Sequence, residues 1–119
     1  MRMSAKPLTI VIFGATGDLF QRKLAGALFD LGQKELLPEH TEIIGFSRKM
    51  LSHDQFRAFI QNALAARSSG KIVEPDAFVS RAFYHQGDLY DAESYASLGK
   101  FLEERDKTNG VCSDKLFHL

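Results

Sequence analysis

The sequence predicts an α/β domain built on a doubly wound parallel sheet. Apolar, β-branched segments alternate along the chain with segments whose apolar residues recur at helical spacing, which is the pattern of parallel strands joined by crossover helices. A glycine-rich turn follows the first of these strands. The 119 residues suit one compact domain, and 45% hydrophobic with 25% charged residues is typical of a packed globular protein.

The first strand and helix follow directly from the N-terminal third of the chain. A strand is expected at residues 8–13, where β-branched and aromatic side chains run up to a glycine. The basic start before this run also resembles a signal peptide, but Asp18 follows so soon that a buried strand explains it better. A helix is then expected over residues 18–31 with Gly32 as its C-terminal cap, and a second strand over residues 42–46.

The second helix has the clearest local signature in the chain. Ser52 and Gln55 form an S-x-x-Q capping box, in which each side chain bonds the backbone N–H of the other residue. Ser68, Ser69 and Gly70 are expected to end this helix. A further short helix is expected from Pro75 through Val79, because proline suits the first position of a helix.

The rest of the chain repeats the alternation. A third strand is expected at residues 82–85, a helix from about Asp91, and a fourth strand at residues 115–119. Three residues of the helix are expected to face the core: Tyr95, Leu98 and Leu102. The chain stops inside the last apolar run, whereas domain boundaries normally fall in polar stretches, so we expect a fragment of a longer protein.

Composition limits the possible partners and compartments. Fifteen lysines and arginines balance fifteen acidic residues, so the chain lacks the positive field that drives nonspecific nucleic-acid binding. No segment has the length of a membrane-spanning helix, and no membrane partner is expected. The single cysteine, Cys112, has no internal partner, which favours the cytoplasm. The four histidines lack the spacing of a metal site.

The segment Gly14-Ala15-Thr16-Gly17-Asp18-Leu19 follows the first expected strand and opens the first expected helix. Glycines let the backbone approach a pyrophosphate closely, while free N–H groups and the positive end of the helix dipole attract the anion. An ordinary strand-to-helix turn also needs glycine for its dihedral angles. The position between strand and helix favours nucleotide binding.

The residues after the second strand bear on the choice of cofactor. Ser47, Arg48 and Lys49 stand where an acidic residue would accept from the ribose 2′-hydroxyl of NAD. A guanidinium can bind phosphate oxygens in bidentate fashion, which favours NADP over NAD. A solvated basic pair is the alternative. Arg48 lies more than thirty positions after Gly14, beyond the usual spacing of about 20.

These residues resemble one known family. Residues 14–19 with Arg22 and Lys23 resemble the Gly-x-Ser/Thr-Gly-Asp-Leu-Ala-x-x-Lys signature of the glucose-6-phosphate dehydrogenases. Phe20 replaces the alanine of that signature, and Ala25-Gly26 replaces a tyrosine-proline or leucine-proline pair, so packing along the first helix must differ. The likeness continues through Leu36-Leu37-Pro38, residues 44–48, Asp88, Asp91-Ala92, Ser94-Tyr95 and Lys115-Leu116-Phe117.

The resemblance implies a Rossmann-type fold in which residues 1–119 form an NAD(P)-binding domain, the first half of the sheet with about four parallel strands. It implies that NADP is the cofactor. The residues it implies for cofactor binding are Gly14, Ala15, Thr16, Gly17, Asp18, Leu19, Arg48, Asp88 and Leu89. Lys23 matches a lysine that reaches toward the sugar phosphate; without the resemblance it reads as an exposed helix lysine.

The family's reaction is the oxidation of glucose 6-phosphate to 6-phosphogluconolactone, with hydride transfer to NADP, in the oxidative pentose phosphate pathway. The resemblance implies that the intact enzyme is a homo-oligomer. The family's general base lies in an Arg-Ile-Asp-His-Tyr type segment that this sequence lacks, so no catalytic residue is expected here and the chain alone should be inactive. The alternatives are a noncatalytic NADP-sensing module and a short sugar-nucleotide epimerase or reductase.

Overall fold

A computed structural model describes residues 6–17, 20–34, 36–38, 40–68, 76–88 and 90–118. Four parallel strands form one sheet in the order β3-β2-β1-β4. This order is that of the first half of a doubly wound sheet, which confirms the predicted fold class. The strands are β1 (Leu8–Phe13), β2 (Thr41–Ser47), β3 (Ala82–Gln86) and β4 (Asp114–His118).

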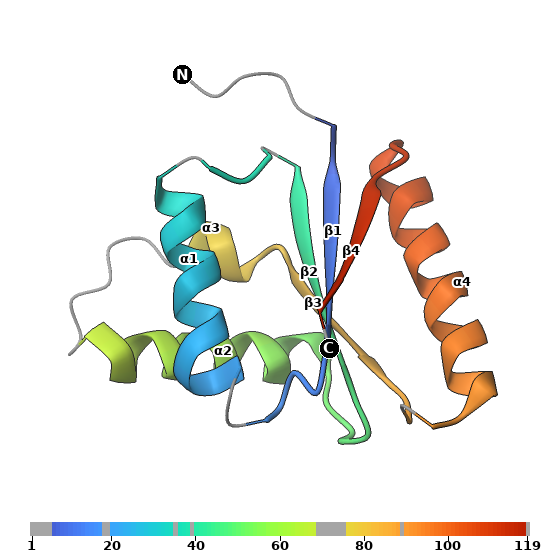
Figure 1. Ribbon diagram of the computed structural model, residues 1–119, viewed down its shortest axis with the longest axis horizontal. Coiled ribbons are helices and arrows are strands. Elements are labelled where there is room, and N and C mark those ends of the chain that lie inside the picture. Colours follow the sequence, from blue (N-terminus) through green and yellow to red (C-terminus); the bar gives the residue numbers. More distant parts are fainter. Residues whose placement is uncertain are drawn as a thin grey trace.

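The helices cover both faces of this sheet. They comprise the π-helical turn η1 (Phe20–Leu24) and the α-helices α1 (Ala25–Gln33), α2 (His53–Ser68), α3 (Asp76–Val79) and α4 (Ala92–Asn109). Figure 1 shows α1, α2 and α3 on one side of the strands and α4 on the other. None of the helices described has both the length and the apolar character needed to cross a bilayer.

Alternation along β1 divides the core between these two layers. Successive side chains of a strand point to opposite faces of its sheet. Ile10 and Ile12 pack with Phe56 of α2 in the larger cluster, whereas Val11 packs with Leu98 of α4 in the smaller one. Both clusters are buried, so β1 is the central strand that its β-branched sequence predicts.

The first helix differs most from its prediction. The expected start at Asp18 lies outside the described residues, and from Phe20 the chain forms a π-helical turn before α1. Phe20 is buried with its ring centroid 5.9 Å from that of Phe56, so the bulky side chain becomes part of the core. The assignment of Gly32 as a cap is wrong: α1 continues to Gln33, and the Leu36 N–H closes its end on the Leu31 carbonyl at 2.9 Å.

The ends of α2 and α4 are fixed by their own sequences. The Ser52 N–H donates to Gln55 Oε1 at 2.8 Å and the Gln55 N–H donates to Ser52 Oγ at 3.0 Å, which confirms the capping box. Asp91 caps α4 by accepting from the Glu93 N–H, and Gly110 ends that helix at φ +66°. Pro75, the expected start of the short helix, lies outside the described residues.

One predicted core position on α4 is only partly covered. Leu98 and Leu102 are buried as expected, but Tyr95 remains 42% exposed. Its ring packs beside Phe13 and also lines an apolar groove that α4 forms with the edge strand β4. The prediction that Tyr95 faces inward is therefore confirmed only in part: its ring packs on Phe13 and Phe46, and the rest of its surface is exposed.

Gly45, in the middle of β2, permits the close approach of α2 and the glycine turn. A Cβ atom there would lie 2.5 Å from the ring of Phe56 and 2.9 Å from the Cβ of Ala15. We expect Gly45→Ala to lower the free energy of unfolding by about 1–3 kcal/mol, the usual cost of overpacking. Gly99→Ala is the matched control, since a Cβ on that exposed glycine of α4 meets nothing within 4 Å. Denaturant titrations that gave both variants the same stability would contradict this assignment.

Candidate nucleotide-binding site

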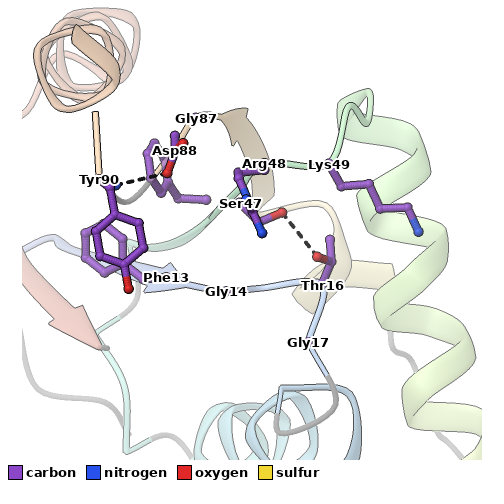
Figure 2. A pocket seen from close by; sticks show the side chains of 11 residues that line it. Phe13, Gly14, Thr16, Gly17, Ser47, Arg48, Lys49, Gly87, Asp88 and Tyr90 are labelled. Atoms are coloured by element: carbon purple, nitrogen blue, oxygen red, sulfur yellow. Dashed lines mark hydrogen bonds between the residues drawn. The ribbon is translucent and has the colours of Figure 1, made fainter. Parts of the chain in front are cut away.

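A cleft of about 520 Å³ lies where the carboxyl ends of β1, β2 and β3 meet. Ligands of doubly wound sheets bind at this edge, in the crevice beyond the ends of the strands. Figure 2 shows that three successive turns contribute side chains to it. The cleft is lined by Phe13, Gly14, Thr16, Gly17, Phe46, Ser47, Arg48, Lys49, Gly87, Asp88 and Tyr90.

The glycine turn after β1 presents bare backbone to this cleft. Gly14 has φ +74°, a conformation that costs an L-residue roughly 1–2 kcal/mol, and a Cβ there would meet open space. The Gly17 N–H donates to the Gly14 carbonyl at 2.9 Å, and a Cβ on Gly17 would lie 3.0 Å from that oxygen. Both glycines are exposed. The turn is thus tight and unobstructed on its outer side, which suits the close approach of a phosphate.

The other residues of the predicted turn have different surroundings. Thr16 lines the cleft, and its Oγ1 lies 3.1 Å from the Oγ of Ser47, a hydrogen bond drawn in Figure 2. Ala15 is fully buried in the core and is not among the residues that line the cleft. Asp18 and Leu19 lie outside the described residues.

The turn after β2 brings two cations to the same cleft. Arg48 and Lys49 are exposed and line the cleft together with Gly14, although they lie far from it in the sequence. The two turns are adjacent because β1 pairs with β2 in register from Leu8–Thr41 to Phe13–Phe46. The structure therefore places the predicted phosphate turn and the predicted 2′-phosphate arginine around one space.

The third wall follows β3. Gly87 lines the cleft, and a Cβ there would lie 2.4 Å from the ring of Phe46, so only glycine fits. Asp88 also lines it, with Oδ1 accepting from the Tyr90 N–H at 3.0 Å. Leu89 lies outside the described residues. Tyr90, which is 92% exposed, also lines the cleft, four residues after the end of β3, and was not among the residues predicted from the sequence.

Lys23 stands apart from the cleft. It is exposed on η1 and is absent from the residues that line the cleft. Its predicted contact, however, is with the sugar phosphate rather than with the nucleotide. This contact with the sugar phosphate stays a prediction.

Comparison with known proteins points to a single family. The family described as "Glucose-6-phosphate dehydrogenase, NAD binding domain" matches residues 11–119. The glucose-6-phosphate 1-dehydrogenase of Chlamydia muridarum is 40% identical over 116 residues, which cover 95% of this chain and 23% of the relative. The chloroplastic glucose-6-phosphate 1-dehydrogenase 1 of Arabidopsis thaliana is 33% identical over 115 residues, which cover 94% of this chain and 20% of the relative.

Solved structures agree with these matches. A glucose-6-phosphate dehydrogenase in complex with its substrate glucose-6-phosphate superposes with a TM-score of 0.78 at 33% identity, over 98% of this chain and 25% of that one. The glucose-6-phosphate 1-dehydrogenase of Mycobacterium avium gives a TM-score of 0.71 at 27% identity, over 95% and 23% of the two chains. This chain thus spans about a fifth to a quarter of the length of these relatives. It belongs to the glucose-6-phosphate dehydrogenase family, as the NAD binding domain of that family.

Proposed function

We propose that this chain binds NADP, with the pyrophosphate over the turn of Gly14 and Gly17 and the 2′-phosphate at Arg48. The observation that carries this proposal is the meeting of both turns in one cleft at the carboxyl ends of adjacent strands. A guanidinium has the geometry for two parallel hydrogen bonds to a phosphate, and Lys49 adds a second positive charge. NAD offers a neutral 2′-hydroxyl here, which leaves both cations without a ligand.

We further propose that the protein containing this chain oxidises glucose 6-phosphate at C1, giving 6-phosphogluconolactone. Bound NADP supplies the hydride acceptor for this chemistry. The residues of this chain bind and orient the dinucleotide, and Lys23 contacts the phosphate of the sugar. The sequence contains no segment that matches the family's general base, so we assign no catalytic residue to these 119 positions.

The lone cysteine, Cys112, is exposed and free, which suits a reducing compartment, and we propose the cytoplasm. The charge balance of fifteen basic and fifteen acidic residues gives no field for nucleic acid. By its likeness to the family we propose a homo-oligomer as the working form of the intact enzyme.

Calorimetric titration of the chain with NADP and with NAD tests the cofactor assignment. We expect NADP to bind about tenfold or more tightly, since hydrogen bonds to charged groups contribute about 1.5–3 kcal/mol. Glucose 6-phosphate added to the NADP complex should give no NADPH absorbance, because the chain lacks a base. Equal affinity for the two cofactors would refute the 2′-phosphate assignment, and measurable turnover would refute the division of roles.

A further inference from the structure

Hydrogen bonds from β3 and from the residue that follows it hold the turn that carries Arg48. Three successive carbonyls, those of residues 47–49, each accept a hydrogen bond from this neighbouring segment. The Gly87 N–H donates to the first at 2.8 Å, the Gln86 side-chain amide to the second at 3.0 Å, and the Tyr84 hydroxyl to the third at 2.5 Å. Two of the three bonds are made by side chains and therefore depend on the identity of those residues.

Tyr84 is itself rigidly held. Only 4% of its surface is exposed, and its ring centroid lies 5.3 Å from that of Phe56. Its backbone N–H donates to Nδ1 of His53 at 3.0 Å, which ties it to the start of α2. The phenol is therefore a fixed support for the exposed turn above it.

The direction of the hydrogen bonds at Tyr84 follows from the donors available. A phenol has one proton, and two carbonyls lie within reach of it, that of Lys49 at 2.5 Å and that of Ser47 at 3.3 Å, so the Tyr84 O–H donates mainly to the nearer Lys49 carbonyl. The Ser47 hydroxyl then donates to the Tyr84 oxygen in a short hydrogen bond. Burial raises the pKa of the Tyr84 phenol, and the bond from Ser47 opposes this only in part, so the donor keeps its proton at neutral pH.

Ser47 extends this arrangement to the glycine turn. Its Oγ lies 3.1 Å from Oγ1 of Thr16, so three hydroxyl groups run in series from the turn after β1 to the turn after β2. Thr16 and Arg48 line the cleft, whereas Tyr84 lies beneath it and is not among the lining residues. Tyr84 can therefore affect a ligand only through the groups it holds.

We propose that Tyr84 is a positioning residue for Arg48, and that its hydroxyl sets the preference for a dinucleotide with a 2′-phosphate over one without. This inference rests on the proposed NADP function. A turn that is already ordered loses less freedom when its arginine engages a ligand, which increases affinity. NAD has no 2′-phosphate for Arg48 to bind, so the ordered turn does not increase its affinity.

The test is a double-mutant cycle between Tyr84→Phe and Arg48→Ala, with NADP and NAD affinities measured on the chain by calorimetry. Phenylalanine keeps the ring that packs on Phe56 and removes only the hydroxyl. We expect Tyr84→Phe to weaken NADP binding about 3- to 10-fold, the range for one neutral hydrogen bond, and to change NAD binding less than about twofold. In the Arg48→Ala background the same substitution should have no further effect on NADP.

Tyr95→Phe is the matched control, because its hydroxyl makes none of the hydrogen bonds seen in the described part of the chain and its ring lies outside the cleft lining. It should leave both affinities unchanged. Equal losses of NADP and NAD in Tyr84→Phe, or the same loss with and without Arg48, would overturn the inference. If Arg48→Ala leaves the ratio of the two affinities intact, the proposed NADP site itself fails. If Arg48→Ala makes the NADP and NAD affinities equal while Tyr84→Phe leaves their ratio unchanged, only the proposed role of Tyr84 is refuted.

Discussion

Arg48→Ala is expected to weaken NADP binding by about 1.5–3 kcal/mol, or about 10- to 150-fold, and to leave NAD binding nearly unchanged. Arg48 is exposed on the turn after β2 and lines the cleft beside the glycine turn. Its carbonyl accepts from Gln86, so the backbone should keep its place when the side chain is shortened. The loss should therefore report the guanidinium alone, as measured by titration with each cofactor.

Arg48→Lys separates charge from geometry in the same position. A lysine keeps the positive charge but cannot form the bidentate pair, so its NADP affinity should fall between those of wild type and the alanine variant. Equal losses of NADP and NAD in Arg48→Ala would remove the 2′-phosphate from this residue. A lysine variant as weak as the alanine variant would show that hydrogen-bond geometry, rather than charge, carries the effect.

Gly14→Ala is expected to weaken NADP and NAD alike, by about tenfold or more, because the displaced contacts are hydrogen bonds to a charged phosphate. The residue has φ +74°, so alanine there either strains the turn by about 1–2 kcal/mol or rotates it out of shape. A Cβ would in addition project into space that a pyrophosphate needs to approach the backbone. This common loss is the opposite of the selective loss expected at Arg48.

Gly110→Ala supplies the control for backbone strain. Gly110 ends α4 at φ +66°, and a Cβ there also meets nothing within 4 Å, yet it is absent from the residues that line the cleft. Thermal melts should show similar destabilisation in both glycine variants, while titrations should show weaker binding only in Gly14→Ala. Unchanged affinity for both cofactors in Gly14→Ala would mean that the turn does not hold the pyrophosphate.

The sequence predicted most of the fold because its signals are local. The β-branched run predicted both ends of β1 correctly, and the capping box of Ser52 and Gln55 marked the start of α2. The first helix was placed less well, because its Gly32 resembles a cap while the actual end is made by a bond between Leu36 and Leu31. Such a bond depends on how the chain after the helix folds back, and a local sequence pattern does not predict that path.

The candidate site was predictable in outline for a related reason. Parallel strands end at one edge, so residues directly after the first two strands, such as Gly14 and Arg48, come together there. The contribution of Tyr84 was not predictable, because it depends on the register that pairs Gly45 with Tyr84 and Ser47 with Gln86. Register is set by packing across the whole sheet, here by Phe56 filling the space beside Gly45.

A crystal structure of this chain grown with NADP tests the central claim most directly. We expect the pyrophosphate to lie against the backbone of Gly14 and Gly17, and the 2′-phosphate to accept hydrogen bonds from the Arg48 guanidinium. The Tyr84 hydroxyl should remain bonded to the Lys49 carbonyl beneath it. A 2′-phosphate turned toward solvent, with Arg48 making no contact to it, would contradict the account.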